Sequence, residues 1–414
     1  MSARRLLAAT ERGPLALAGH RDVHGVAPAG GPELIEAVQQ AGLRGRGGAG
    51  FPTAEKLRSV AAQRGTRHML VNGAEGDPMS RKDRHLLHVA PHLVLDGAIA
   101  AAQAVGARRI TIAMPQDAGA ALDAVRHAVG ERRDAPPIDV RPVPVAYLAG
   151  EESALIHHLD GGPLRPTVVP PFPSRRGLGR RPTLVQNPET LAHLALIARH
   201  GPRWFREAGT AAQPGTALLT ISGAVARPGV YEVALGTPLD AALALAGDAT
   251  EPLRAFLVGG HHGAWIDAAA HSALTLDDAS LRSAGAGLGA GIIVALGRSA
   301  CPVQELAQGL AWLAGQSAHQ CGPCHHGLPA LTGLLTAIAA GRPAPATPGL
   351  LTRWSEDVTG RGACHLPDGA ARVIRSGLRV FGEELTEHAH HGPCAACRRP
   401  TTIPLPLTAT PRAA

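Results

Sequence analysis

Short apolar segments alternate with helical patterns in the first part of the chain, and this alternation limits the fold more than any other feature. Apolar segments that are typical of strands lie at residues 68–71 (HMLV), 109–113 (RITIA) and 138–142. Helical patterns lie at 32–41, 86–107 and 118–130. A strand, helix, strand, helix, strand order predicts a parallel sheet with helices on its faces, so we expect an α/β fold.

The pattern of expected secondary structure changes twice further along the chain. From Thr216 it alternates in short strands and turns around one helix at 239–246, which indicates a small β-rich domain. From Cys301 it becomes helical again and carries all six cysteines of the chain, and after Arg399 we expect a frayed tail. We therefore predict four parts: an α/β domain at 1–212, a β-rich domain at 213–298, a helical domain at 299–392, and a tail with a C-x-x-C pair at 393–414.

Composition excludes several classes of function. The 414 residues exceed what one hydrophobic core supports, so two or three domains are expected. The formal charge of +7 is modest and the arginines are dispersed, so no nucleic-acid-binding stripe is indicated. No run reaches the roughly 18 apolar residues of a membrane span, and we expect a cytoplasmic protein.

A glycine-rich loop with three cations lies between Gly42 and Lys56 (GLRGRGGAGFPTAEK). It contains G-x-G-x-x-G, but it follows a helical pattern, whereas a dinucleotide-binding loop needs a strand before it. The remaining interpretation is a loop whose free N–H groups, beside Arg44, Arg46 and Lys56, could cradle a phosphate. The alternative is an ordinary flexible surface loop.

Polar clusters follow the predicted strands. Glu75 and Asp77 lie just after the strand at 68–71, where open α/β sheets bind ligands. Two further clusters supply Gly150, Glu151, Glu152, Gln186, Asn187 and Thr190. Carboxylates at a helix start are also ordinary capping chemistry. Only Lys56 and Lys82 are lysines among forty basic residues, and both lie near these clusters, which points to positions where a compact charge is needed.

In this combination and order the motifs resemble a known family. GRGGAGFPTAEK, NGAEGDPMSRKDR, YLAGEESALI and PPFPSRRGLGRRPTLVQNPETLA are similar to the NADH- and FMN-binding subunit of respiratory NADH:quinone oxidoreductase. Relatives of that subunit include NAD-linked hydrogenase and formate dehydrogenase subunits. The resemblance covers most of the chain and implies a Rossmann-like FMN domain, a β-grasp domain of the soluble-ligand-binding (SLBB) type and a helical iron–sulfur domain.

The resemblance also implies site residues. Those that would line FMN are Gly45, Arg46, Gly47, Lys56, Asn72, Glu75, Gly150, Glu151, Glu152, Gln186, Asn187 and Thr190. Phe51, Phe172 and Asp77 would lie at the nicotinamide dinucleotide, NAD(H). The chain departs from the family at Ala74, Val169 and Ser59, where the family has an aspartate, a lysine and an aromatic residue. These losses are expected to weaken NADH binding more than FMN binding.

The cysteine region departs further from the family pattern. Cys321, Cys324 and Cys364 match ligands of a [4Fe–4S] cluster, but Ala318 stands where the first ligand belongs. The candidates for the fourth ligand are His319, His325, Cys394 and Cys397. Two alternatives stay open: a zinc site built from the two C-x-x-C pairs, or thiols that bind nothing. We expect Cys301 to be a core residue and the histidine run at 388–391 to be solvated.

The implied activity is NADH oxidation by hydride transfer to FMN, followed by one-electron transfer through the iron–sulfur cluster to a partner. The expected partners are NADH and a ferredoxin-like or other iron–sulfur acceptor subunit, with peripheral association to the inner face of a membrane as an option. Two other classes of function stay open. One is a flavoprotein that exchanges electrons with ferredoxin and does not use NADH, and the other is a flavin-free binding or assembly subunit.

Overall fold

The computed structural model describes residues 4–8, 10, 13–26 and 30–404, and the chain divides into two compact units. The first unit comprises Met1–Gly76, Ser80–Leu219 and Glu232–Thr237. The second comprises Asp77–Met79, Thr220–Tyr231 and Pro238–Ala414. Within the described ranges, no single helix is long and apolar enough to cross a membrane, and the one helix pair that passes the same test is bent by 97°.

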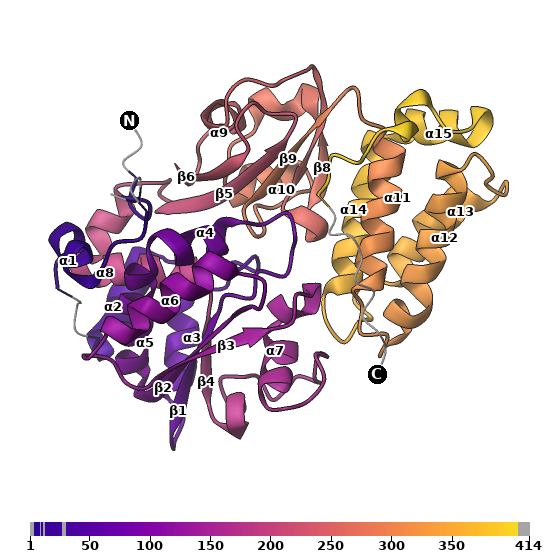
Figure 1. The fold of residues 1–414 in the computed structure, drawn as a ribbon. Helices are drawn as coiled ribbons and strands as arrows, with labels where there is room; N and C mark the ends of the chain where they lie inside the picture. Colours follow the sequence, from indigo (N-terminus) through magenta and orange to yellow (C-terminus); the bar gives the residue numbers. More distant parts are fainter. Residues whose placement is uncertain (1–3, 9, 11–12, 27–29, 405–414) are drawn as a thin grey trace. The chain divides into compact units, whose positions relative to one another are not determined.

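A four-stranded parallel sheet forms the centre of the first unit (Figure 1). Its order is β3-β2-β1-β4, with β1 (Arg67–Asn72), β2 (Ala107–Pro115), β3 (Ile138–Val143) and β4 (Thr183–Gln186). The central strands are rich in Ile, Val, Leu and Met and most of their residues are buried, as a sheet covered by helices requires. The three strands predicted from the sequence are confirmed.

Helices surround this sheet, and the predicted helix at 32–41 is α2 with the same bounds. The others are α1 (Leu17–His24), α3 (Thr53–Ala61), α4 (Lys82–Val89), α5 (Pro91–Val105), α6 (Gly119–Glu131), α7 (Glu152–Leu159) and α8 (Pro188–Arg206). The two long helices α5 and α8 pack against each other, and α5 also packs on β1 and β2. Leu155 and Ile156 of α7 join a core cluster with Leu70, Ala113 and Val185 from three strands.

The prediction of one helix from Leu86 to Ala107 was wrong, because α4 ends at Val89 and α5 begins at Pro91. Proline has no N–H to donate within a helix, but it suits the first position of a new one. The apolar pattern continues across the break, since both helices are largely buried, so periodicity alone did not reveal it.

Gly97 in α5 lies directly against the backbone of Leu191 in α8, and we expect Gly97→Ala to be destabilising. A Cβ atom at Gly97 would lie 1.9 Å from the carbonyl oxygen of Leu191. Separating the helices to admit it should cost about 1–3 kcal/mol in the free energy of unfolding. Gly130→Ala is the matched control, since Gly130 is an exposed glycine of α6 with nothing within 4 Å of an added methyl group. That change should be neutral or stabilise by up to about 1 kcal/mol in urea unfolding. Equal effects of the two substitutions would contradict this packing argument.

A five-stranded sheet of order β6-β5-β9-β7-β8 follows in the chain. Its strands are β5 (Thr216–Gly223), β6 (Gly229–Ala234), β7 (Leu253–Val258), β8 (Ala264–Asp267) and β9 (Ile292–Gly297). The pairing is mixed, since β9 runs parallel to β5 and antiparallel to β7. The short helices α9 (Leu239–Leu245) and α10 (Asp278–Ser283) lie between strands in the sequence, as expected for the predicted β-rich domain.

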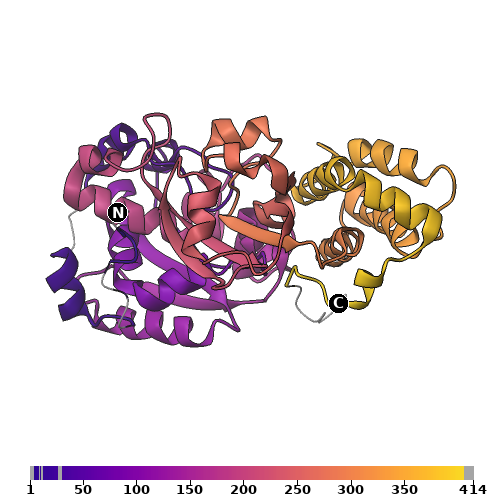
Figure 2. The same ribbon diagram turned by 90° about the horizontal axis from the view of Figure 1, so that it is seen from above.

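The rest of the second unit is helical, as predicted from Cys301 onward. It comprises α11 (Pro302–Gly315), α12 (Leu328–Ala339), α13 (Thr347–Asp357), α14 (Leu366–Val380) and α15 (Gly382–His391). Both ribbon views show these helices as one bundle (Figures 1 and 2), and α14 also packs on β8. A π-helical turn at Pro323–Gly327 precedes α12, and a short 3-10 turn at Ala395–Arg398 follows α15.

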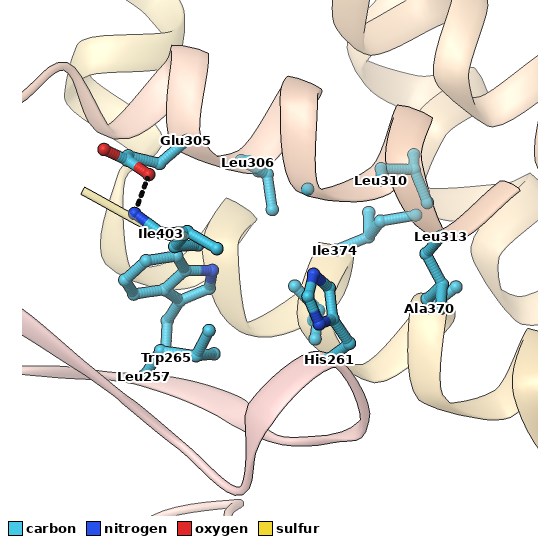
Figure 3. Close-up of a pocket in the computed structure, with 12 residues that line it drawn as sticks. Leu257, His261, Trp265, Glu305, Leu306, Leu310, Leu313, Ala370, Ile374 and Ile403 are labelled. Atoms are coloured by element: carbon cyan, nitrogen blue, oxygen red, sulfur yellow. Dashed lines mark hydrogen bonds between the residues drawn. The ribbon is translucent and has the colours of Figure 1, made fainter. Parts of the chain in front are cut away.

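The segment after Arg399 is not a frayed tail as far as Ile403. The carboxylate of Glu305 in α11 accepts hydrogen bonds from the backbone N–H groups of Thr402 and Ile403, the latter at 3.0 Å. The Ile403 side chain is buried and helps to line a cavity of about 20 Å³ beside Trp265 (Figure 3). A space of this size holds about one water molecule, so it is a packing defect and not a ligand site.

Candidate functional site

The parallel sheet has a topological switch point between β1 and β4. The chain proceeds from β1 to β2 on one side, while β4 pairs with β1 on the other. Loops that leave the carboxyl ends of β1 and β4 therefore diverge, and open α/β sheets bind their ligands in the crevice formed there. Asn72 ends β1, Gln186 ends β4 and Asn187 follows it, so polar side chains meet at this edge.

The two ends of the glycine-rich loop pair with each other, and one hydrogen bond joins the loop to α8. Arg44 and Pro52 form a bridge, and the Gly45 N–H donates to the Phe51 carbonyl at 2.9 Å. The Arg46 N–H donates to the Thr190 hydroxyl in α8 at 2.9 Å. A Cβ atom on Gly47 would lie 3.5 Å from the Asn187 side chain, so the loop runs close to the end of β4.

The tip of the loop offers free backbone donors. In the part of the chain that the structure describes, the N–H groups at 47–50 donate to no other protein group. Gly48 and Gly50 have φ values of 116° and 61°, which glycine adopts without strain. Successive free N–H groups beside cations form an anion-binding concavity, which is the geometry that a phosphate requires.

Two helices bring further predicted residues to the same edge. The Lys56 ammonium in α3 lies 2.8 Å from the Glu152 carboxylate at the start of α7, and 3.4 Å from the Val185 carbonyl in β4. Asn72 donates to the Gly150 carbonyl at 2.9 Å. Glu151 accepts the Ala154 N–H at 2.7 Å and so caps α7, which is the ordinary alternative for a carboxylate at a helix start.

A buried network of charged side chains contacts Asn187 at this edge of the sheet. Lys82 is 1% exposed, and its ammonium lies 2.9 Å from Asp83 and 2.8 Å from Glu189. Burial would lower the pKa of Lys82, but these two carboxylates raise it instead. Asp83 also accepts a hydrogen bond of 2.6 Å from Asn187, the N-cap of α8. The network therefore fixes the orientation of a predicted ligand-binding amide.

Arg46 belongs to the same network. Its guanidinium donates to the carbonyl oxygens of Arg44 and Thr216 and lies 3.8 Å from Glu189. Burial raises the pKa of Glu189, an effect that Lys82 and Arg46 oppose. Asp83 and Glu189 were not predicted from the sequence, and the scarcity of lysine around Lys82 was the only signal pointing to them.

Glu75 has a structural role in this arrangement. Its φ of 34° is rare for a residue other than glycine, and its carboxylate accepts the N–H groups of Asp83 and Arg84, both at 3.0 Å. These bonds cap the start of α4. Burial raises the pKa of Glu75, and the nearby Asp83 carboxylate adds to this effect. A ligand role for Glu75 stays a prediction.

Two buried polar atoms at the edge have no protein partner among the described residues. They are Nε2 of Gln186, a residue that is 4% exposed, and the hydroxyl of Thr53 at the start of α3. A buried donor without an acceptor costs about 1–3 kcal/mol, so such groups call for a ligand or a water molecule. The Gln186 amide is therefore the strongest single indication of a bound polar ring edge.

The residues predicted at the dinucleotide lie in different environments. Phe51 and Phe172 are 47% and 57% exposed, which is unusual for phenylalanine and leaves both rings available for stacking. Asp77 instead accepts the His261 backbone N–H at 2.8 Å and contacts the His261 ring at 3.1 Å. Burial alone would raise the pKa of Asp77, but His261 lowers it overall. A role for Asp77 toward NADH stays a prediction.

The three predicted cluster cysteines come together in the helical bundle. Cys324 is buried in the π-helical turn before α12, and Cys321 and Cys364 are half-buried beside it. Burial raises the pKa of Cys324 to about 12, and the neighbouring Cys321 and Cys364 contribute to this shift. Thiols gathered in this way suit a metal centre, whose positive charge offsets the cost of the thiolates.

Comparison with known proteins places the chain in a family. Residues 38–196 match the Nuo51 FMN-binding domain, 218–260 the SLBB domain, and 304–388 the NADH-ubiquinone oxidoreductase-F iron–sulfur binding region. The F subunit of the NADH-quinone oxidoreductase of Streptomyces coelicolor is 34% identical over 371 residues, which cover 86% of this chain and 83% of the relative. The second F subunit of Rhizobium meliloti is 30% identical, over 87% of this chain and 90% of the relative. The chain belongs to the family of NADH-quinone oxidoreductase F subunits.

Solved structures agree with this membership. An NAD⁺-reducing [NiFe]-hydrogenase in the H₂-reduced state matches with a TM-score of 0.81 and 31% identity over 87% of this chain. The match spans 63% of that hydrogenase chain. The predicted order of an FMN domain, an SLBB domain and an iron–sulfur region is confirmed, as is the class of an NADH dehydrogenase-type oxidoreductase with FMN and an iron–sulfur centre.

The three residues that depart from the family pattern differ in their burial. Ala74, in place of an aspartate, is buried in the core cluster with Leu70 and Val185, so an apolar contact replaces the charge. Val169, in place of a lysine, is 42% exposed, and Ser59 is exposed on α3. Neither of the latter supports the fold, so both substitutions act on the surface of the first unit.

Proposed function

We propose that this chain oxidises NADH with a bound FMN and delivers the electrons singly to an iron–sulfur centre and then to a partner subunit. The observation that carries the proposal is the carboxyl edge of β1 and β4. At this edge lie the free N–H groups of the glycine-rich loop and the buried Nε2 of Gln186, which has no protein partner among the described residues. These groups fit a flavin mononucleotide, which presents a phosphate and a flat ring with polar edges.

The chain's own residues would divide the binding between them. The N–H groups at 47–50 and the nearby Arg44 would bind and neutralise the phosphate. Gln186 and Asn72 would hydrogen-bond the ring edge, while Asn187 and Thr190 hold the loop and α8 in place. Lys56 is a third exposed, so its charge remains accessible to an anion despite its pairing with Glu152.

FMN, when bound, supplies the exchange between a two-electron hydride and single electrons, so the protein needs no acid–base pair of its own. The exposed rings of Phe51 and Phe172 would stack on the nicotinamide dinucleotide and hold it over the site. Cys321, Cys324 and Cys364 would bind the iron–sulfur cluster, with a fourth ligand from the adjacent His319 or His325. The relatives are named as subunits, which supports a partner subunit as the electron acceptor. Our proposal is that this partner carries an iron–sulfur centre and that the complex lies on the cytoplasmic side of a membrane.

Anaerobic stopped-flow mixing of the FMN-loaded chain with NADH tests the proposed donor. The flavin absorbance should bleach, and Phe51→Ala and Phe172→Ala should raise the NADH concentration needed for half-maximal bleaching. Val23→Ala, which shortens an exposed apolar side chain of α1 outside every predicted contact, is the control. A flavin that stays oxidised with NADH but is reduced by reduced ferredoxin would favour the alternative donor.

Gln186→Leu should have opposite effects on the free and the FMN-bound chain. Leucine removes a buried donor that has no partner, so the unfolding midpoint of the flavin-free chain should stay the same or rise. FMN affinity should fall by about tenfold or more, since a buried hydrogen bond to the ring is lost. Isothermal titration and thermal unfolding with and without FMN measure both quantities. Loss of stability in the flavin-free variant with unchanged FMN affinity would show that Gln186 is a core residue only.

A further inference from the structure

We propose that Cys301, His388, Cys394 and Cys397 bind a structural zinc ion at the C-terminal end of the helical bundle. The four ligand atoms lie within 4.8 Å of one another, and no other such group of three or more His, Cys, Asp or Glu occurs in the described ranges. This site is separate from Cys321, Cys324 and Cys364, and it does not depend on the proposed function.

Four of the six distances between the ligand atoms lie close to those around a tetrahedral ion, and the other two are at most 4.8 Å. Sγ of Cys394 lies 3.7 Å from Sγ of Cys397, which lies 3.8 Å from Nε2 of His388. Sγ of Cys301 lies 3.5 Å from the same nitrogen and 3.3 Å from Sγ of Cys397. With zinc–sulfur bonds of about 2.3 Å and zinc–nitrogen bonds of about 2.0–2.1 Å, tetrahedral ligands lie about 3.6–3.8 Å apart. Small shifts of the side chains would therefore complete the coordination.

The ligand set and its burial favour zinc in a closed site. Three sulfurs and one imidazole are a common structural zinc combination and leave no position for a substrate. Cys301 and His388 are 4% and 3% exposed, so they offer a dry side of the site, while Cys394 gives access to the ion from solvent. The expectation that Cys301 is a core residue is confirmed by its burial, whereas the expectation of a solvated His388 is wrong. His390 and His391 are not buried, in line with the prediction.

The same geometry argues against a cubane iron–sulfur cluster at these four residues and against a zinc site built from both C-x-x-C pairs. In a cubane cluster each thiolate binds a different iron at a different corner, so its ligands lie further apart than ligands that share one ion. The zinc site that the sequence suggested, from both C-x-x-C pairs, is also wrong, because Cys394 and Cys397 meet Cys301 and His388 instead of Cys321 and Cys324.

An ion at this position would fasten the end of the chain to the start of the bundle. Cys301 is the N-cap of α11 and His388 lies in the last turn of α15. Cys394 is the N-cap of the 3-10 turn that follows, and Cys397 lies within that turn. Neighbouring hydrogen bonds also connect the start of α11 with the segment after α15. Gln304 donates to the Arg399 carbonyl, and Glu305 accepts from the N–H groups of Thr402 and Ile403. The ion would close a loop of 96 residues between Cys301 and Cys397, a constraint that stabilises the folded state.

Metal analysis of the full chain, purified with its flavin and iron under reducing conditions, tests the proposal. We expect about one zinc ion per chain, and replacement of zinc by Co²⁺ should give the visible bands of tetrahedral cobalt with thiolate charge-transfer absorption. The double variant Cys394→Ser/Cys397→Ser should lose the zinc and keep the iron. The matched control Cys321→Ser should lose iron and keep the zinc.

Cobalt titration of the chelator-treated wild-type chain keeps the test decisive if the double variant does not fold. A wild-type chain that takes up neither zinc nor tetrahedral cobalt would overturn the proposal, as would iron bound in place of zinc or zinc retained by the double variant. A disulfide between Cys394 and Cys397 in anaerobically prepared protein would overturn it as well.

Discussion

Lys82→Met should lower the free energy of unfolding by about 3–5 kcal/mol at neutral pH. The substitution removes the cation between two buried carboxylates, Asp83 and Glu189, which lie 2.9 and 2.8 Å from it. Methionine fills much of the lysine volume, so the loss reports two buried carboxylates that have lost their shared cation and not a cavity. Urea unfolding monitored by circular dichroism measures the change.

The other lysine of the chain is the matched control. Lys56 forms an ion pair with Glu152 at the same distance, 2.8 Å, but both side chains are about a third exposed. Solvent screens such a pair, so Lys56→Met should cost at most about 1 kcal/mol of stability while it weakens FMN binding. Equal losses of stability in the two variants would contradict the assignment of Lys82 to a buried network.

The Lys82→Met effect should also depend on pH. In the wild type the pKa of Lys82 is raised, so its stabilising contribution is complete below the unfolded value of 10.5 and is lost as pH rises through the folded value. In the variant, burial keeps the pKa of Glu189 above the ordinary glutamate value of 4.5, so the penalty for its charge shrinks as pH falls toward the acid range. A penalty that is the same at about pH 5 and about pH 8 would indicate lost packing instead.

Cys364→Ser should remove the iron–sulfur centre while leaving the flavin in place. Ala318 stands where the family has its first cysteine ligand, so the centre has only three thiolates, and we expect each of them to be needed. Iron and acid-labile sulfide should drop to background and the cluster's electron paramagnetic resonance signal should vanish, whereas NADH should still bleach the flavin. Cys394→Ser is the control and should keep the iron. Full iron content in Cys364→Ser would remove this residue from the ligand set.

The sequence predicted most of the sheet but not β4. The strands at 68–71, 109–113 and 138–142 were each bounded by helical patterns, so their periodicity was readable. β4 has four residues, all of them buried, between Pro182 and Pro188, so it shows neither alternation nor length. Its pairing with β1 is set by tertiary contacts, and this pairing creates the switch point that defines the site.

The sequence also predicted only the part of the site that consecutive residues form. Local motifs gave the glycine-rich loop and the polar strand ends, because a phosphate-binding loop is encoded by consecutive residues. Asp83 and Glu189, the two buried carboxylates that contact Lys82, lie 106 positions apart in the sequence. Cys301 and His388 lie 87 positions apart. Side chains brought together by folding over such separations leave no spacing pattern to read, so only the structure shows them as neighbours.

Titration of the flavin-free chain with FMN, followed by quenching of the flavin fluorescence, tests the central claim most directly. We predict saturable binding of one FMN per chain, with lower affinity in Gln186→Leu and Lys56→Met. A folded wild-type chain that leaves the fluorescence of added FMN unchanged would contradict the assignment of the β1 and β4 edge as a flavin site.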